Sequence, residues 1–283
     1  MRIPVAHRRE TFMEDNLATP PGSRNPKLGR IRIYPIKSLP GVECSTIATT
    51  SRGVLANDRR FALVRQDGSF LNAKTDARLH RFRLQATPDL TRIVITDGPR
   101  STPFEFDPHA GTDSLADWFR RRLRTHVRII ACPLRGFPDD SHAPGPTVIS
   151  TATLTTIASW YSDLSLEEVR SRFRANLEIE DVPSFWEDQL CAEKHQPMRS
   201  FRIGPVPFLG SNPCQRCLVP TRHPSSSAPL PHFAKIFRRQ RQASLPEWAP
   251  RSQFNHYYRA GINTIIQPTA IQSIRIGDPV EFP

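Results

Sequence analysis

The stretch RIRIYPIKSLPG (Arg30–Gly41) joins a strand-like run to a tight turn. Its first half alternates β-branched and basic residues, which is typical of a strand with one buried face. The strand then breaks after Ile36, and a proline–glycine turn presents Lys37 and Ser38. A lysine beside a hydroxyl and free backbone N–H groups is suited to holding a phosphate. The alternative is an ordinary exposed turn.

Further strand-like runs follow and outnumber the expected helices. They are RFALVRQDGSFL (60–71), TRIVITDG (91–98) and HVRIIA (126–131), rich in β-branched and aromatic residues and punctuated by Asp-Gly turns. Helices are expected around 114–124, from 150 or 151 to about 161, and from SLEEVRSRF onwards, where Ser165 and Glu168 have capping-box spacing. This pattern predicts a mainly β (α+β) fold with two β-barrel-like domains, a few attached helices and a cleft between the domains.

The loop PLRGFPDDSHAPGP (133–146) is the predicted domain boundary. The expected division is a flexible leader over 1–28, an N-terminal β-barrel domain over 29–137 and a second domain over 138–283. The leader lacks an apolar segment and carries acidic residues, so it fits neither a secretory signal nor a transit peptide. A Pro/Ser-rich segment over 220–252 is expected to be a lid, a binding loop or disordered.

The chain is strongly basic, with a formal net charge of +12. The arginines of 120–124 lie in an amphipathic pattern, where they are explained as a solvated helix face or a cationic last turn. No nucleic-acid-binding motif accompanies the charge, so nucleic acid is not expected as a partner. The positive field suits an anionic cofactor or an acidic electron-transfer protein. No apolar run is long enough to predict a membrane span.

Five widely spaced cysteines argue against a disulfide framework and for a reducing compartment, so a cytoplasmic location is expected. Cys214 and Cys217 stand together in CQRC. A zinc site could add Cys191 and His195, whereas a redox dithiol would open a helix, which the flanking prolines disfavour. The remaining interpretations are one thiolate ligand to a redox metal, with Arg216 helping to keep it deprotonated, or two buried small side chains.

Two other basic stretches could donate to an anion. DRRF opens a strand, so alternation would send Arg59 and Arg60 to opposite faces. RFRANLEI places Arg172, Arg174 and Asn176 at a helix-to-strand junction, again alternating. One or two of these side chains could bind a phosphate or the edge of a pterin. Taken singly, each fits solvent exposure or a pairing with a structural carboxylate.

Taken in order, several stretches resemble the MOSC domain preceded by its N-terminal β-barrel domain. This is the arrangement of the amidoxime-reducing molybdoenzymes and of the C-terminal part of molybdenum cofactor sulfurases. The resemblance covers roughly residue 29 to the C-terminus, and the ordered set is more specific than any single motif. The stretches are RIYPIKSLPG, GVLANDRRFALV, RFRANLEI, FWEDQL, FRIGPVPF, CQRC and IQSIRIGDPVEF.

The resemblance implies a molybdenum cofactor in the cleft: molybdenum on the dithiolene of a phosphorylated pyranopterin, with one cysteine as a further ligand. The second cysteine of the motif, Cys217, matches that catalytic metal ligand. The matching cofactor-binding positions are Lys37, Ser38, Arg59, Arg174, Asn176, Gln215 and Arg216. The family also brings an association with pyridoxal phosphate binding. The turn PTRHPSSSA departs from the family's T-V-D-P-x-T-G type, because Arg222 and His223 replace an acidic position, and this leaves substrate preference open.

The implied activity is that of a molybdenum-dependent oxidoreductase that removes oxygen from N-hydroxylated compounds. The chain has neither a ferredoxin-type cysteine pattern nor a dinucleotide fingerprint, so electrons are expected from separate proteins, a ferredoxin or small haem protein with its reductase. The alternatives are a non-catalytic molybdenum cofactor carrier or sulfur-transfer module, and a zinc-stabilised binding protein. Metal analysis separates zinc from molybdenum, and turnover separates an enzyme from a carrier.

Overall fold

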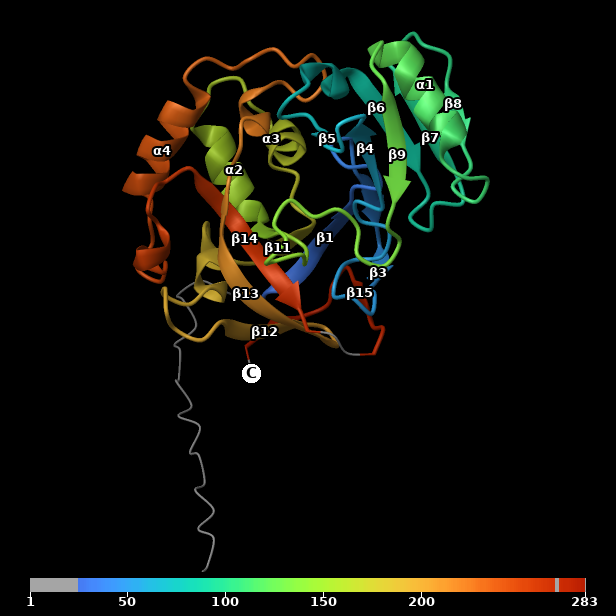
Figure 1. Cartoon of the computed structure of the whole chain (residues 1–283). Coiled ribbons are helices and arrows are strands. Elements are labelled where there is room, and N and C mark those ends of the chain that lie inside the picture. Colours follow the sequence, from blue (N-terminus) through green and yellow to red (C-terminus); the bar gives the residue numbers. More distant parts are fainter. Residues whose placement is uncertain (1–24, 268–269, 283) are drawn as a thin grey trace, which may run out of the picture.

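A computed structural model describes residues 25–267 and 270–282. Residues 1–24 of the predicted leader (1–28) lie outside the described ranges. The first strand begins within the predicted leader, at Lys27. Short strands dominate the described chain, and four α-helices accompany them (Figure 1). The strands are β1 (Lys27–Ile33), β2 (Val42–Cys44), β3 (Thr46–Ala48), β4 (Phe61–Arg65), β5 (Phe70–Leu71), β6 (Phe82–Ala86), β7 (Ile93–Asp97), β8 (Phe104–Phe106), β9 (Val127–Ala131), β10 (Val148–Ser150), β11 (Leu177–Glu180), β12 (Arg199–Ile203), β13 (Val206–Gln215), β14 (Arg259–Ile266), β15 (Ser273–Arg275) and β16 (Val280–Glu281). The helices are α1 (Asp113–Leu123), α2 (Thr151–Ser159), α3 (Leu166–Phe173) and α4 (Phe233–Ala243), with 3₁₀ turns η1 (Ala77–Arg81), η2 (Trp186–Leu190), η3 (Val219–Thr221) and η4 (Arg251–Gln253).

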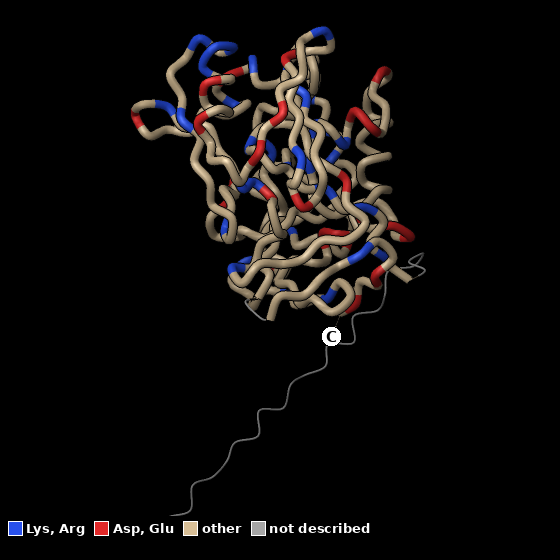
Figure 2. The backbone as a smooth tube through the Cα atoms, turned by 90° about the vertical axis from the view of Figure 1, so that its right-hand side faces the viewer, with Lys and Arg blue, Asp and Glu red and all other residues tan. Residues whose placement is uncertain are grey.

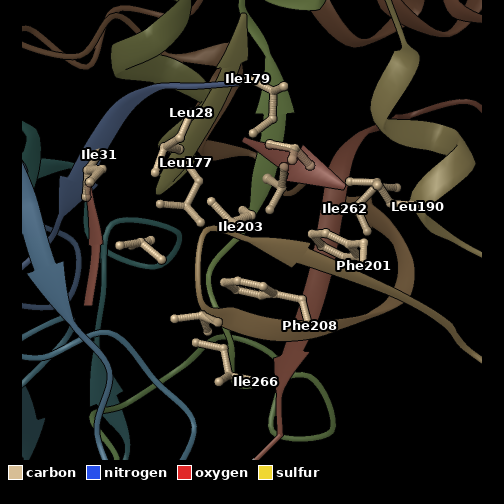
Figure 3. Packing of buried hydrophobic residues seen from close by; sticks show 14 of the residues in the cluster. Leu28, Ile31, Leu177, Ile179, Leu190, Phe201, Ile203, Phe208, Ile262 and Ile266 are labelled. Atoms are coloured by element: carbon tan, nitrogen blue, oxygen red, sulfur yellow. The ribbon is translucent and has the colours of Figure 1, made fainter. Parts of the chain in front are cut away.

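The largest sheet has the strand order β16-β12-β13-β14-β10-β11-β1-β2. Its strand pairs are antiparallel except for β10 and β11, which run parallel. Side chains from strands far apart in sequence, such as Leu28, Leu177, Phe201 and Phe208, pack together on it (Figure 3). Burying one such side chain contributes roughly 1.5–3 kcal/mol. Because β1 pairs with β11, the start of the chain is built into the same sheet as its C-terminal half.

A second core lies under two smaller sheets, β5-β4-β9 and β6-β7-β8. Helix α1 covers it with the apolar face that the sequence predicts, and both Trp118 and Phe119 are buried. The Phe119 ring meets Phe82 edge-on, with 5.2 Å between ring centroids. Figure 1 shows α1 with β7, β8 and β9 at one corner of the molecule, away from the other helices.

Helices α2, α3 and α4 gather on the opposite side and share a third core (Figure 1). The capping prediction for α3 is confirmed, because the Glu168 N–H donates to Ser165 Oγ at 3.1 Å. Helix α4 corrects the expectation that 220–252 is a lid, a binding loop or disordered, and that the chain has only three helices. Phe233, Phe237 and Arg241 recur every four residues on its buried face, a signal masked by the surrounding prolines and serines.

The mainly β class with attached helices is confirmed. Within the described ranges, no sheet closes into a barrel by strand pairing. The domain division at 137 and 138 stays a prediction.

Charged residues are spread over the whole fold. In Figure 2, Lys and Arg positions are interleaved with Asp and Glu from one end of the molecule to the other. Some form ion pairs between elements, such as Arg30 with Glu43 at 2.7 Å. Of the helices in the described ranges, none has both the length and the apolar composition needed to cross a bilayer.

Candidate functional site

A cavity of about 750 Å³ is lined by segments from both halves of the chain. Positive charge dominates its wall, since only two carboxylates accompany a larger set of cations among the described lining residues. The cations are Lys37, Arg59, Lys74, Arg172, Arg174, Lys194, Arg216 and Arg259, and the carboxylates are Asp139 and Asp140. Such a wall favours an anionic ligand.

Most of the residues singled out in the sequence meet at this cavity. Those in its wall are Lys37, Ser38, Arg59, Arg174, Gln215, Arg216 and Cys217. Asn176 is buried behind the wall, and its amide donates to the Arg32 carbonyl at 3.0 Å and accepts from the Thr147 N–H at 3.2 Å. These bonds tie β1 to the segment before β10, so Asn176 supports the cavity from outside its lining.

The turn after β1 holds Lys37 in the wall. Its backbone N–H donates to the Phe61 carbonyl at 2.8 Å, which fixes the turn against β4. The ammonium group, on a side chain that is 9% exposed, donates to the Phe137 carbonyl at 2.9 Å and to Asp139 at 2.8 Å. Ser38 has a φ of 75°, and its hydroxyl accepts from the Ala73 N–H at 3.1 Å. A non-glycine residue in this left-handed conformation costs energy and is found most often at functional sites.

Asp139 reaches the cavity from the predicted boundary loop. Its carboxylate lies 2.8 Å from Lys37 Nζ and 3.7 Å from Lys74 Nζ. Glycine lets the loop approach this closely, because Gly136 has a φ of 59° and a Cβ there would lie 2.4 Å from the Asp58 carbonyl oxygen. Burial by itself raises the pKa of Asp139, but the charges of Arg59 and Lys37 outweigh it and hold that pKa well below its ordinary value. An anion therefore already sits among these cations.

Arg59 is positioned by a carboxylate and an amide. It adopts a φ of 49° in the turn before β4, and its guanidinium donates to Asp58 and, at 3.5 Å, to Asn176 Oδ1. Burial lowers the pKa of Arg59, but the carboxylates of Asp58 and Asp139 raise it further than burial lowers it. The guanidinium is thus a permanent cation aimed into the cavity.

Arg174 ends helix α3 in the left-handed conformation, with a φ of 54°. Its guanidinium lies over the Tyr34 ring, 4.1 Å from the centroid, and donates to the Leu39 carbonyl at 2.7 Å. Burial lowers the pKa of Arg174, and no carboxylate of the described chain forms an ion pair with it. Guanidinium donors without a carboxylate partner are available to a ligand.

The two thiols lie at the end of β13, and both line the cavity. Arg216 Nη1 donates to Cys214 Sγ at 3.0 Å, while its other terminal nitrogen donates to the Phe173 carbonyl. The arginine of the motif therefore contacts Cys214 and not Cys217. The Cys217 sulfur accepts from the Val219 N–H at 3.5 Å. Burial lowers the pKa of Arg216, but its electrostatic interactions with Cys214 and Cys217 and its hydrogen bond to Cys214 raise it.

The four-ligand zinc arrangement does not form. Cys191 is 1% exposed, and burial raises its pKa well above the ordinary value. No group of three histidine, cysteine, aspartate or glutamate side chains in the described part of the chain could hold a metal ion. Cys191 and His195 are thus not assembled with Cys214 and Cys217 into a metal site.

Sequence reasoning missed the contribution of the boundary loop. Asp140 accepts weakly from the amides of Asn212 and Asn263, at 3.5 and 3.4 Å, and so links the loop to β13 and β14. The sequence patterns indicate Asp139 and Asp140 only as part of the predicted boundary loop. One feature of the sequence could have indicated this contribution: two adjacent carboxylates in a loop of a strongly basic protein are expected to pair with cations.

Two protein-family models match the chain. The model described as the MOSC N-terminal beta barrel domain matches residues 25–126, and that of the MOSC domain matches residues 143–281. No curated protein matches the sequence. Among solved structures, one titled as a hypothetical protein is 10% identical with a TM-score of 0.39, covering 92% of this chain and 69% of its own. The YUAD protein from Bacillus subtilis is 13% identical with a TM-score of 0.35, covering 91% of this chain and 95% of its own.

Proposed function

The chain belongs to the MOSC domain family and carries the N-terminal MOSC β-barrel domain as well, and from this premise we propose that it binds a molybdenum cofactor and reduces N-hydroxylated compounds. The observation that carries the proposal is one cavity that combines unpaired guanidinium groups with two thiols. When bound, molybdenum on the dithiolene of a phosphorylated pyranopterin would supply the two-electron chemistry that removes oxygen from an N–O bond.

The cationic end of the cavity fits the phosphate of such a group. Lys37, Arg59 and Lys74 surround the Asp139 carboxylate, which marks a position where negative charge is stabilised. A phosphate makes charge-assisted hydrogen bonds with the same donors. Arg174 offers further donors on the side of Tyr34 and would orient the pterin. Asn176 acts as a positioning residue, because its amide holds Arg59 and the backbone on either side.

The thiol end fits a soft metal. Thiolate sulfur is the ligand type that soft and redox-active metals select. Cys214 accepts from the Arg216 guanidinium at 3.0 Å, whereas Cys217 accepts only from a neutral backbone donor, the Val219 N–H at 3.5 Å, within the described chain. This difference supports Cys217 as the metal ligand. Gln215 and Arg216 flank it and would contact the cofactor from the same strand end.

The test compares Cys217→Ser with Cys214→Ser. We expect Cys217→Ser to abolish reduction of benzamidoxime by a chemical reductant and to loosen the metal, while Cys214→Ser does much less. Molybdenum, zinc and pterin contents of the purified proteins are measured alongside turnover. Equal losses in both variants, or stoichiometric zinc, would contradict the proposal. Bound cofactor without turnover would favour the carrier or sulfur-transfer alternative.

Electrons would come from separate proteins. The net charge of +12 supports a weak, charge-steered encounter with an acidic ferredoxin or small haem protein. We expect no turnover with NADH alone and restored turnover with a reductase and an acidic carrier, falling as salt rises. Oxidation of NADH by the isolated, metal-loaded protein would refute this path. Five free thiols support a reducing compartment, and we propose the cytoplasm.

A further inference from the structure

A second cavity, of about 240 Å³, adjoins the first. The two share lining residues from four segments, including Ser38 and Arg174. The rest of the lining comes from residues that no role has been assigned to so far. Those that bear on the argument are Tyr34, Leu79, His80, Arg83 and Arg222.

Three arginines of this second cavity lack a carboxylate partner in the described chain, whereas Arg32 and Arg172 in the same lining are paired with Glu43 and Glu168. No aspartate or glutamate belongs to its described lining. Arg83 and Arg222 donate only to backbone carbonyls, those nearest being His80 O and Ala73 O, each at 3.0 Å. Arg174 likewise donates to a carbonyl, that of Leu39 at 2.7 Å. Within the described ranges, these three guanidinium groups have no carboxylate partner, although partly buried charges are normally paired.

His80 is the second sign of a binding site. It is 8% exposed, and its Nε2 is buried without a hydrogen bond of full geometry in the described structure, although backbone groups of Ala73 and Pro224 lie near enough to the ring to raise its pKa. Burial, followed by the charges of Arg222 and Arg174, lowers the pKa of His80, so the imidazole stays neutral beside them. A buried polar atom without a full hydrogen bond calls for an explanation, and a ligand group is one.

Part of the remaining wall is apolar. Tyr34, Leu79 and Val219 line it together with two prolines. The volume lies just below the range typical of pockets for drug-sized ligands, which indicates a smaller molecule. We propose that this cavity binds a small organic anion, with its carboxylate or phosphate among Arg83, Arg222 and His80 and its apolar body against Tyr34 and Leu79.

The proposal does not depend on the cofactor assignment, since it uses contacts of the second cavity. If the proposed activity holds as well, the shared wall at Ser38 and Arg174 would make anionic N-hydroxylated compounds the preferred substrates. The turn that carries Arg222 begins shortly after Cys217, so the two cavities are linked through η3.

The experiment measures benzoate binding to the full-length protein by calorimetry, with neutral benzamide as the matched probe. We expect benzoate to bind and benzamide not to bind. Arg222→Gln and Arg83→Gln should each weaken benzoate about tenfold to a hundredfold, because each removes a charge-assisted hydrogen bond. Arg121→Gln, on the exposed face of α1, and Lys37→Ala, in the first cavity only, should leave benzoate affinity unchanged.

Competition with inorganic phosphate separates the two sources of the anion. Displacement of benzoate by phosphate indicates a general oxyanion site, and no displacement restricts the site to organic acids. The proposal is overturned if benzamide binds as tightly as benzoate, or if Lys37→Ala abolishes benzoate binding while Arg222→Gln does not. Melting curves without ligand identify any variant that fails to fold, in which case His80→Gln provides a second variant in the same wall.

Discussion

Two arginine environments of the protein, around Arg241 and around Arg174, differ in one respect. Between η2 and α4, Arg241 is fully buried and forms an ion pair with Asp188, and its guanidinium lies 4.1 Å from the Phe185 ring centroid. In the large cavity, Arg174 stacks on an aromatic ring in the same way, at 4.1 Å from Tyr34, but it has no carboxylate in an ion pair within the described chain. The first arrangement is complete in itself, whereas the second leaves donors for a ligand. An arginine without a carboxylate partner thus keeps donors that Arg241 has already used.

The largest effect is expected from breaking the complete pair. Asp188→Asn leaves the fully buried Arg241 without its counter-charge, which should lower the free energy of unfolding by about 3–5 kcal/mol in urea titrations. The matched control is Asp117→Asn, which breaks an exposed pair with Arg120 on α1 and should cost at most about 1 kcal/mol. Equal losses in the two variants would remove the distinction.

The residue next to this pair makes stability depend on pH. Glu187 is fully buried and accepts from Thr153 Oγ1 at 3.0 Å. Burial and the charge of Asp188 raise the pKa of Glu187 to about 7, from an ordinary value of 4.5.

The native state therefore binds this proton more tightly than the unfolded state. The contribution of Glu187 is fully present below pH 4.5 and is lost as pH rises to about 7, by roughly 3 kcal/mol. Glu187→Gln should flatten this part of the pH–stability curve, measured by urea unfolding between pH 4.5 and 8. A Glu187→Gln curve with the same slope as the wild type across this window would contradict the assignment.

The cavity cations should affect binding more than folding. Lys37→Ala and Arg59→Ala each remove a charge-assisted bond to an anion, worth about 1.5–3 kcal/mol, or tenfold to a hundredfold in affinity. Molybdenum and pterin contents should fall in both variants. Arg59→Ala also leaves the nearly buried Asp58 carboxylate without its partner, so its melting temperature should fall more than that of Lys37→Ala, whose partner Asp139 is more exposed. Lys235→Ala, on the exposed side of α4, is the control. Full cofactor occupancy in both cavity variants would rule out this anion site.

The smallest effect on stability is expected from replacing Arg174, and it can be compared directly with the effect of replacing Arg241. Arg174→Met leaves no carboxylate unpaired, so we expect its free energy of unfolding to stay within about 1 kcal/mol of the wild type. Arg241→Met, by contrast, leaves the buried Asp188 carboxylate without its counter-charge and should be strongly destabilising. Urea unfolding of both variants at one pH decides the point, and similar losses would mean that Arg174 also has a structural role.

Local sequence patterns predicted much of the fold. The apolar spacing around Trp118 gave α1, and the Ser165–Glu168 spacing gave the start of α3. Helix α4 was missed because its few apolar residues lie in a Pro/Ser-rich segment. For the site, the ordered motifs pointed to residues that line one cavity, with Asn176 placed behind it.

The sequence by itself determined the periodicities of the strands and helices, the excess of positive charge, the scarcity of cysteine and the order of family motifs. Only the tertiary structure decided which charges meet: Asp139 with Lys37 across about a hundred residues, Arg216 with Cys214 and not Cys217, and Arg241 with Asp188 and not solvent. Periodicity is a local property, because each residue's face is set by its own element. Pairing of distant charges depends on how elements pack, and local patterns carry no record of that packing.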